Sequence, residues 1–420
     1  MLKITVQRDG TGDFTTISEA VLAVPYECEA EIEIGPGIYR EKLVCEKQNI
    51  TLRGAGADQT RVVWGDGGKL PHPDGRPTHT FRSYTAFFSG ENLTVEDLTI
   101  ENDAGPGAQV GQAVAAYVDS ARAVFRRVKL LGNQDTLFCA PLPEKEREKD
   151  GFLGPRGLAP RRASAQYYHK CEIAGDIDFI FGGADALFEQ CTLRTVDNHI
   201  PHSYVTAPSG KADGLGFVFW DCDFVSDCPA GSVYLGRPWR PEGKTAVLDC
   251  RLGAHIAPEG FIAWNDRTDT GLATFAEADS AGPGAAERLR QQRKPQCMRQ
   301  RPGHPFRHVV AAPTAAGRHR DDAVIPDCSA RHRAGHRLGK VHLDLCAEQP
   351  GCHLQAQLHR RPALPLVFGA EDSVPDDALI PVGRGGPFQP AQIVAGPGQP
   401  HSRTAAQLLQ TGHTRLTAQQ

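Results

Sequence analysis

Residues 217–224 read Phe217-Val-Phe-Trp-Asp-Cys222-Asp-Phe224, and five other segments of the chain repeat this pattern. In each segment, one apolar residue lies three positions before an anchor residue and another lies two positions after it. The six anchors are Leu98, Val128, Cys171, Cys191, Cys222 and Cys250. Strand-like segments at such loosely regular intervals predict the coils of a solenoid, because no single coil could bury its own apolar face.

A β-sandwich is the alternative for a chain of many short strands. Its turns would come at shorter intervals and its anchor positions would resemble one another less. The repeat therefore favours an all-β solenoid, with variable loops between the strands. The longest of these loops covers residues 139–165 and contains a polar run at 141–150. We expect this run to be exposed to solvent.

Four of the anchors are cysteines, and the chain has twelve cysteines in all. None of the twelve belongs to a CxxC pair. In a solenoid, equivalent positions stack in a column, so we expect reduced thiols packed in the core rather than disulfides or metal ligands.

The overall charge of the 420-residue chain is −4, with 46 Lys and Arg against 50 Asp and Glu. This balance argues against a globally basic nucleic-acid-binding protein. No apolar run approaches the length that a membrane-spanning helix needs. The N-terminus lacks the architecture of a signal peptide, so we expect a cytoplasmic monomer, or a secreted one if the true start lies upstream.

The composition changes near residue 285. Residues 1–285 contain 15 Phe, 8 Tyr and 4 Trp, whereas residues 286–420 contain three Phe and no Tyr or Trp. The second segment has 16 Arg but 2 Lys and ten of the 16 His, without a sustained period. We expect the folded domain that carries the function to be residues 1–285. The tail is expected to be disordered or the product of a shifted reading frame, with no part in the chemistry.

Three polar clusters interrupt the apolar rhythm of the repeats. They are Gly132-Asn133-Gln134-Asp135-Thr136, Gly175-Asp176-Ile177-Asp178-Phe179-Ile180-Phe181, and Tyr234-Leu235-Gly236-Arg237-Pro238-Trp239. Each alone could be an ordinary turn. Three clusters on different coils point to a shared site, because a solenoid stacks equivalent positions side by side. Asp178 lies among apolar residues, where an unpaired carboxylate is costly, and Arg237 is its candidate partner.

The ordered set of motifs resembles the pectinesterases (pectin methylesterases) over residues 4–285. The matching motifs, in chain order, are Gly10-Thr-Gly-Asp-Phe-Thr-Thr-Ile-Ser-Glu-Ala-Val21, Gly37-Ile-Tyr39-Arg-Glu41, Thr80-Phe81-Arg-Ser, Gly111-Gln112-Ala-Val-Ala, Gly132-Asn-Gln-Asp135-Thr-Leu-Phe, Asp178-Phe-Ile-Phe-Gly182, Leu235-Gly-Arg-Pro-Trp239, Ala273-Thr-Phe-Ala-Glu277 and Gly282-Pro-Gly284. The resemblance implies a right-handed parallel β-helix. It also implies hydrolysis of methyl esters on the galacturonosyl units of pectin or of methylated oligogalacturonides, with release of methanol and no metal or other cofactor.

The resemblance also implies a role for individual residues. Asp178 would be the nucleophile, Asp135 the general acid and base, and Gln112 and Gln134 the amides that stabilise the oxyanion. Arg237 and Trp239 match substrate-contacting positions, as do Thr80 and Phe181. The step from Asp135 to Asp178 is longer than in the plant enzymes because of the 139–165 loop, and the family's final segment is lost after Gly284.

Two carboxyl groups can act as nucleophile and proton donor if their pKa values differ. We expect the ion pair with Arg237 to lower the pKa of Asp178, and the charge of Asp178 to raise the pKa of Asp135. If residues 175–181 are extended, Asp176 and Asp178 share one face, so alternation cannot choose between them. We expect Asp176 to be solvated or bonded to a turn amide.

Other functions remain open from the sequence. An esterase or thioesterase acting on another acyl group would need the same acid–base set. A non-catalytic carbohydrate-binding solenoid should have lost Asp135, Asp178 or Arg237, and all three are present. A polygalacturonase would need clustered carboxylates with a histidine, and a pectate lyase would need an acidic calcium site. Neither set occurs before residue 286.

Overall fold

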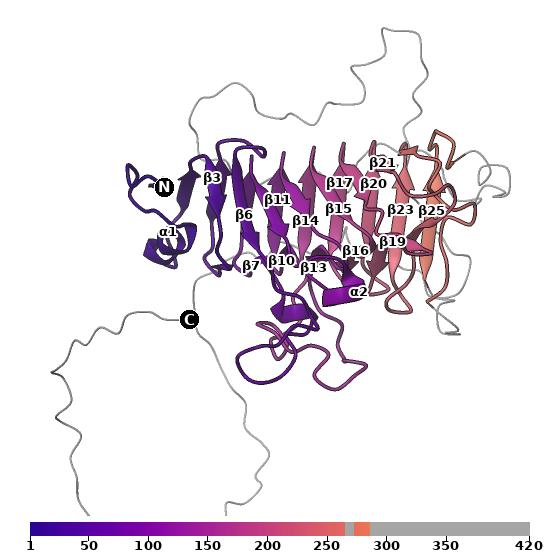
Figure 1. The fold of residues 1–420 in the computed structure, drawn as a ribbon, viewed down its shortest axis with the longest axis horizontal. Helices are drawn as coiled ribbons and strands as arrows, with labels where there is room; N and C mark the ends of the chain where they lie inside the picture. The colour runs from indigo at the N-terminus through magenta and orange to yellow at the C-terminus, as the bar shows by residue number, and fades with distance from the viewer. Residues whose placement is uncertain (265–272, 286–420) are drawn as a thin grey trace, which may run out of the picture. The chain divides into compact units, whose positions relative to one another are not determined.

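The computed structural model describes residues 1–264 and 273–285, which form a parallel β-helix of three sheets (Figure 1). Neighbouring strands within each sheet pair in parallel, for example Leu137 of one coil with Ile180 of the next. This arrangement is the solenoid that the repeat predicts and the parallel β-helix that the resemblance implies, and it excludes a β-sandwich. No helix in the described part of the chain is long and apolar enough to cross a membrane.

The first sheet has ten strands. In spatial order they are β1 (Leu2–Val6), β2 (Ala30–Ile34), β5 (Ile50–Gly54), β8 (Leu93–Glu96), β11 (Arg122–Arg126), β14 (Ala165–His169), β17 (Asp185–Glu189), β20 (Phe217–Trp220), β23 (Lys244–Leu248) and β25 (Thr274–Ala278).

The second sheet has eight strands, and the third has seven. The eight are β3 (Gly37–Tyr39), β6 (Thr60–Trp64), β9 (Thr99–Asn102), β12 (Lys129–Leu131), β15 (Glu172–Gly175), β18 (Thr192–Thr195), β21 (Asp223–Ser226) and β24 (Arg251–Leu252). The seven are β4 (Leu43–Cys45), β7 (Ala86–Phe88), β10 (Ala116–Val118), β13 (Leu137–Cys139), β16 (Ile177–Gly182), β19 (Ser203–Pro208) and β22 (Val233–Gly236). The seven-stranded sheet carries the site described below.

Each repeat segment contains a corner that the sequence analysis did not predict. The segment expected to be one strand is two strands, such as β20 and β21, and the residue before each anchor has a left-handed backbone. The φ values are 57° at Asp97, 52° at Arg127, 53° at Lys170 and Gln190, and 52° at Asp221 and Asp249. This conformation turns the chain sharply from the ten-stranded to the eight-stranded sheet. The anchor that follows is buried in the core.

The interior is stacked in columns along the coils. The four anchor cysteines are free thiols and are buried, which confirms the predicted core column. Their sulfurs contact main-chain groups; the Cys191 thiol, for instance, donates to the Tyr168 carbonyl oxygen at 3.3 Å. Beside them, stacked rings succeed one another on neighbouring coils, with centroids 4.7 Å apart for Tyr168 and Phe188 and 4.6 Å apart for Phe188 and Phe219. Each coil thus buries the face of the next.

Helix α1 (Ile17–Ala23) lies at the N-terminal end of the β-helix (Figure 1). Its first turn is capped by Thr16, whose hydroxyl accepts a hydrogen bond from the Glu19 amide. The Glu41 carboxylate accepts further bonds from the amides of Ile17, at 2.9 Å, and Ser18, at 2.7 Å. Negative charge is favourable at a helix N-terminus. Glu41, two residues after the Gly-Ile-Tyr motif, therefore stabilises the N-terminus of α1.

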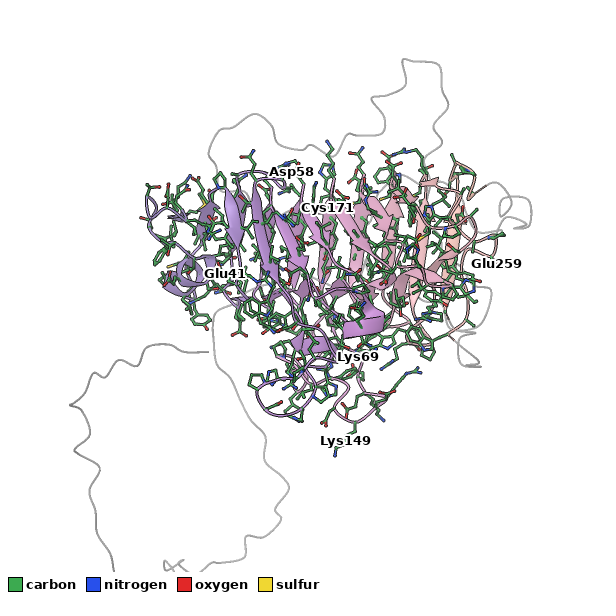
Figure 2. All side chains as sticks on the ribbon, in the orientation of Figure 1. Glu41, Asp58, Lys69, Lys149, Cys171 and Glu259 are labelled. Carbon is green, nitrogen blue, oxygen red and sulfur yellow. The ribbon has the colours of Figure 1, made fainter. Side chains whose placement is uncertain are left out.

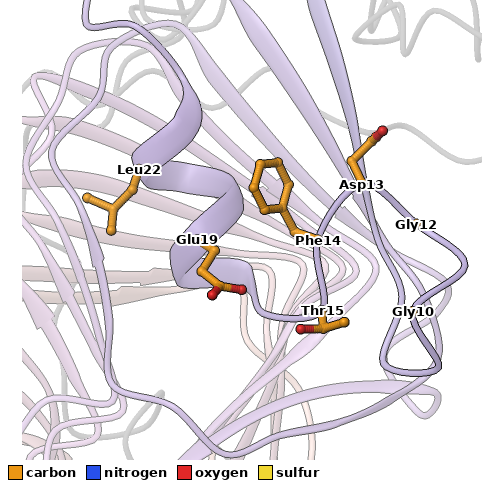
Figure 3. Close-up of a pocket in the computed structure, with 7 residues that line it drawn as sticks. All are labelled: Gly10, Gly12, Asp13, Phe14, Thr15, Glu19 and Leu22. Carbon is orange, nitrogen blue, oxygen red and sulfur yellow. The ribbon is translucent and has the colours of Figure 1, made fainter.

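A pocket beside this helix is lined by Gly10, Gly12, Asp13, Phe14, Thr15, Glu19 and Leu22 (Figure 3). All of these residues precede the second strand, and none belongs to the three polar clusters. The pocket is therefore separate from the candidate active site.

Candidate active site

Asp135 and Asp178 lie at equivalent positions on adjacent coils. Asp135 is two residues before Leu137, Asp178 is two residues before Ile180, and Leu137 pairs with Ile180. The Asp135 amide donates to the Ile177 carbonyl oxygen at 3.0 Å, which fixes the two turns together. The predicted meeting of the first two polar clusters is confirmed.

Both aspartates have a left-handed backbone, with φ of 65° at Asp135 and 49° at Asp178. The extended conformation assumed for residues 175–181 is therefore wrong at Asp178, where the pairing of β16 with β19 also shifts register between Ile177 and Ile180. Asp adopts this region more readily than most residues, because its short side chain can bond locally. The bulge gives Asp176 and Asp178 different surroundings, so alternation along a strand does not apply to them.

Arg237 binds Asp178 through both carboxylate oxygens. Arg237 Nε lies 2.9 Å from Asp178 Oδ1, and Nη2 lies 2.7 Å from Oδ2. Both side chains are mostly buried. The bidentate geometry fixes the rotation of the carboxylate as well as its position. The partner predicted for Asp178 is confirmed.

Two aromatic rings enclose the Arg237 guanidinium, and the sequence analysis identified neither. The guanidinium carbon lies 3.8 Å from the ring centre of Tyr204 and 4.2 Å from that of Trp264. Such contacts stabilise a cation and shield it from water. Tyr204 belongs to β19, which lies between β16 and β22, so a register assignment of the strands could have identified it; Trp264 carried no such signal.

Burial outweighs the ion pair in its effect on the pKa of Asp178. Desolvation raises this pKa above its ordinary value, although the hydrogen bonds and charge of Arg237 lower it. The expectation of a lowered pKa was therefore wrong, because it counted the partner and not the loss of water. Arg237 still favours the ionised form that a nucleophile needs.

The pKa of Asp135 is raised well above its ordinary value, as predicted. Desolvation is the main cause, and the charge of Asp178 is the second. The bidentate cation of the site binds Asp178 and not Asp135. The two carboxyl groups thus differ in the direction that an acid and a nucleophile require.

Asp176 is buried and bonded to a backbone amide, so of the two surroundings expected for it the structure shows the bond and not solvation. Its Oδ1 accepts a hydrogen bond from the Ile177 amide at 2.7 Å, and its Oδ2 accepts one from Asn198 Nδ2 at 2.7 Å. Asn198 Nδ2 also donates to Asn133 Oδ1 at 2.8 Å. Asp176 therefore helps to hold the turn that precedes Asp135.

Gln112 and Gln134 lie on neighbouring coils at the same edge. The Ala113 amide donates to the Gln134 carbonyl oxygen at 2.9 Å, so the two backbones are adjacent. Both side chains are partly exposed, and no group within residues 1–264 and 273–285 forms a hydrogen bond with either side-chain amide. Small residues leave room for them: a Cβ at Gly68 would lie 3.0 Å from Gln112 Oε1, and one at Gly107 would collide with Gln134 Oε1.

Trp239 and Phe181 belong to one aromatic cluster, with ring centres 5.8 Å apart. Trp239 is partly exposed, whereas Phe181 is 3% exposed and is covered by Phe81 and Phe138. Thr80 begins the short helix η1 (Thr80–Arg82) and is partly exposed. The substrate contacts expected of Thr80, Phe181 and Trp239 stay predictions. Trp239 offers the more accessible ring.

A metal site would need converging ligands. Among the described residues there is no group of three or more His, Cys, Asp and Glu side chains that could hold an ion.

Comparison with known proteins identifies the family. The profile of the pectinesterase family matches residues 3–142 and 161–302. The chain belongs to the pectinesterase family. It is 30% identical to Pectinesterase 31 of Arabidopsis thaliana over 74% of this chain and 92% of that protein. It is 33% identical to the pectinesterase/pectinesterase inhibitor PPE8B of Prunus persica over 67% of this chain, but spans 51% of that longer protein.

Solved structures of the family share the β-helix. Pectin methylesterase from carrot has a TM-score of 0.57 and 28% identity over 68% of this chain and 84% of its own. Pectin methylesterase PemA from Erwinia chrysanthemi has a TM-score of 0.54 and 25% identity, over 68% of this chain and 90% of its own. Membership of the pectinesterase family makes this chain a carboxylic ester hydrolase. The family profile also continues beyond the boundary expected at residue 285, to residue 302, and residues 286–420 lie outside the described structure.

Proposed function

We propose that this chain removes methyl esters from galacturonosyl units of pectin or of methylated oligogalacturonides through a covalent intermediate on Asp178. The observation that carries the proposal is the bidentate Arg237–Asp178 pair beside the more strongly raised carboxyl of Asp135. A homologous pectin methylesterase has been solved in complex with a hexasaccharide, at 26% identity and a TM-score of 0.56, which supports a carbohydrate substrate.

The first half of the reaction is acyl transfer. An Asp178 oxygen attacks the ester carbonyl carbon, and negative charge develops on the carbonyl oxygen. The side-chain amides of Gln112 and Gln134 would donate to this oxyanion without adding a charge of their own. The tetrahedral intermediate then expels the methoxy group, which takes a proton from Asp135 and leaves as methanol. An anhydride between Asp178 and the galacturonosyl carboxyl remains.

The second half is hydrolysis of that anhydride. Asp135, now ionised, takes a proton from an entering water, and the resulting hydroxide attacks the acyl carbon. The Asp178 carboxylate leaves, and Arg237 again binds both of its oxygens. Asp135 ends the cycle protonated. The raised pKa of Asp135 suits both steps, because one group must give and then accept a proton near working pH.

Methanol release provides the test. Purified protein should release methanol from methylated pectin or short methylated oligogalacturonides. Substitution Asp178→Asn should abolish this release without unfolding the β-helix. Substitution Asp227→Asn changes a carboxyl group outside the polar clusters and serves as the matched control. Release of an acyl product from an unrelated ester, with none from methylated galacturonides, would reject the proposed substrate.

A further inference from the structure

One segment of the described β-helix has no counterpart in the family profile. The profile skips residues 143–160, which lie in the connection between β13 and β14. Residues 144–149 are exposed, as predicted for the polar run 141–150, whereas Leu142 near its start is buried. Lys149 lies at the tip of a projection on the same side of the ribbon as Lys69 (Figure 2). We call residues 143–160 the insertion.

The insertion is attached to the coils that precede Asp135. Arg156 forms an ion pair with Asp119, a buried residue that directly follows β10. Gly154 lies against η1, since a Cβ at this position would be 2.6 Å from the Phe81 carbonyl oxygen. Just after the insertion, Arg162 donates to the carbonyl oxygens of Ser89 and Asp119 at 2.8 and 3.1 Å.

The two ends of the insertion are joined by Arg161. Its guanidinium donates to the Pro143 carbonyl oxygen at 3.1 Å and to those of Arg156, Gly157 and Ala159 at 2.9, 3.0 and 2.7 Å. These four hydrogen bonds from one side chain hold the start of the insertion against its last residues. The start and the end of the insertion therefore lie close together.

The insertion also contacts coils that follow Asp178. Glu144 lies 2.8 Å from Lys211 in the connection after β19, although both side chains are exposed. Arg240 donates to the Lys145 carbonyl oxygen at 3.1 Å, and its guanidinium lies 4.7 Å from the ring centre of Trp239. The insertion therefore extends along the outside of the seven-stranded sheet from the coil of Asp119 to that of Trp239.

Phe152 is the apolar centre of the insertion. It is 7% exposed, and its ring lies 5.9 Å from Phe81 and 6.4 Å from Trp239, edge to face in both cases. Arg161 covers it at 5.7 Å. Edge-to-face pairs fix the relative orientation of two rings in addition to burying them. Phe152 thus limits where the indole of Trp239 can lie.

We propose that the insertion is a specificity element of this esterase, in which Phe152 is a positioning residue that holds Trp239 against the galacturonide chain. This inference rests on the proposed function for its substrate class. The insertion has four acidic and four basic residues, so it carries no net charge that would favour anionic over methylated galacturonide chains. Its effect comes through shape and apolar contact. Binding should depend on Phe152, while the chemical step at Asp178 should not.

The experiment compares Phe152→Ala, Phe152→Leu and Leu158→Ala in the full chain. Leu158 is a fully exposed apolar residue of the same insertion and provides the control. Methanol release from a methylated hexagalacturonide gives kcat and KM. Calorimetric titration with unesterified hexagalacturonate gives Kd without any reaction, and thermal unfolding checks that each variant is folded.

For Phe152→Ala we expect KM and Kd to rise together by about three- to tenfold, with kcat within about twofold of the unchanged chain. Phe152→Leu should recover part of the loss, and Leu158→Ala should match the unchanged chain. Raising the salt concentration should not change the ratio of KM values between variant and unchanged chain.

Unchanged KM and Kd in folded Phe152→Ala would overturn the inference, as would a fall in kcat alone. Tighter binding after the substitution would also overturn it, because Phe152 would then hinder binding of the galacturonide chain. If the unchanged chain binds hexagalacturonate but releases no methanol, the proposed function fails while the binding comparison still tests Phe152. Absence of hexagalacturonate binding by the unchanged chain would overturn the inference.

Discussion

The guanidinium of Arg237 reaches across one intervening coil to hold both oxygens of Asp178. Arg237 follows β22, Asp178 lies in β16, and β19 is the strand between them. Tyr204 of that middle strand lies under the guanidinium at 3.8 Å. The pair is therefore built from three successive coils. It depends on their stacking rather than on any local segment.

Removing either member of this pair should have a large effect on both activity and stability. We expect Asp178→Asn to lower methanol release by at least about 10³-fold, because the proposed nucleophile is lost. The same change leaves Arg237 buried without its counter-ion, which should cost about 3 kcal/mol of unfolding free energy. Single-turnover kinetics and denaturant unfolding measure the two effects. Retention of a tenth of the activity would contradict the role given to Asp178.

Arg237→Lys keeps the charge but loses the planar, two-point contact. A lysine cannot bind both carboxylate oxygens in the same fork or stack between Tyr204 and Trp264 as a guanidinium does. We expect kcat to fall by about 10²-fold and the protein to remain folded. Measurement of kcat with circular dichroism on the same samples tests this. Activity equal to that of the unchanged chain would show that charge alone suffices.

Asp176→Asn should be far milder than Asp178→Asn. The new side chain can still accept from the Ile177 amide, but its amide group would face the Asn198 amide that now donates to Asp176. The turn that carries Asn133 and Asp135 should loosen, and we expect kcat to fall by about tenfold. Steady-state kinetics of the two Asn variants, prepared side by side, decide the matter. A dead Asp176→Asn with an active Asp178→Asn would reverse the assignment.

The two glutamines should act on turnover rather than on stability. Gln112→Ala and Gln134→Ala would each remove one of the two donors proposed for the oxyanion, so kcat should fall by about 10²–10³-fold. Neither side-chain amide bonds to another described residue, so the melting temperature should change little. The matched comparison is Gln109→Ala in the nearby helix α2 (Gly107–Val110), whose exposed side chain lies outside the site. A clearly lower melting temperature with an unchanged kcat would contradict the proposed role.

The solenoid could be predicted from the sequence because it follows from repetition, and the ion pair because a carboxylate among apolar residues needs a cationic partner. Apolar positions at fixed offsets from Leu98 and Cys222 define coils, and stacked coils bring Asp178 toward Arg237. The backbone corners could not be predicted, since residues as different as Arg127 and Asp221 adopt the same left-handed conformation there. That conformation is imposed by the path of the coil and not by residue preference.

The surroundings of the site could not be predicted from the sequence either. The pKa of Asp178 depends on how completely neighbouring coils exclude water, and apolar neighbours in the sequence did not reveal that burial would exceed the effect of Arg237. Phe152 and Trp264 lie in connections without any repeat, so no register argument placed them beside Trp239 or Arg237. Such contacts depend on the loop conformations.

Asp135→Asn should abolish methanol release yet stabilise the fold, and the sign follows from the raised pKa. A carboxyl whose pKa is raised by folding binds its proton more tightly in the folded state. Its contribution to stability is therefore present at low pH and is lost as the pH rises from the unfolded pKa of 3.8 through the folded pKa. Asn cannot ionise, so the cost of burying a charge near Asp178 disappears. We expect the variant to gain melting temperature over the unchanged chain at about pH 8 and to gain less at about pH 4. Ser209→Ala, another buried polar position, controls for general repacking. An equal change in melting temperature at both pH values would show that the carboxyl of Asp135 is not the group responsible.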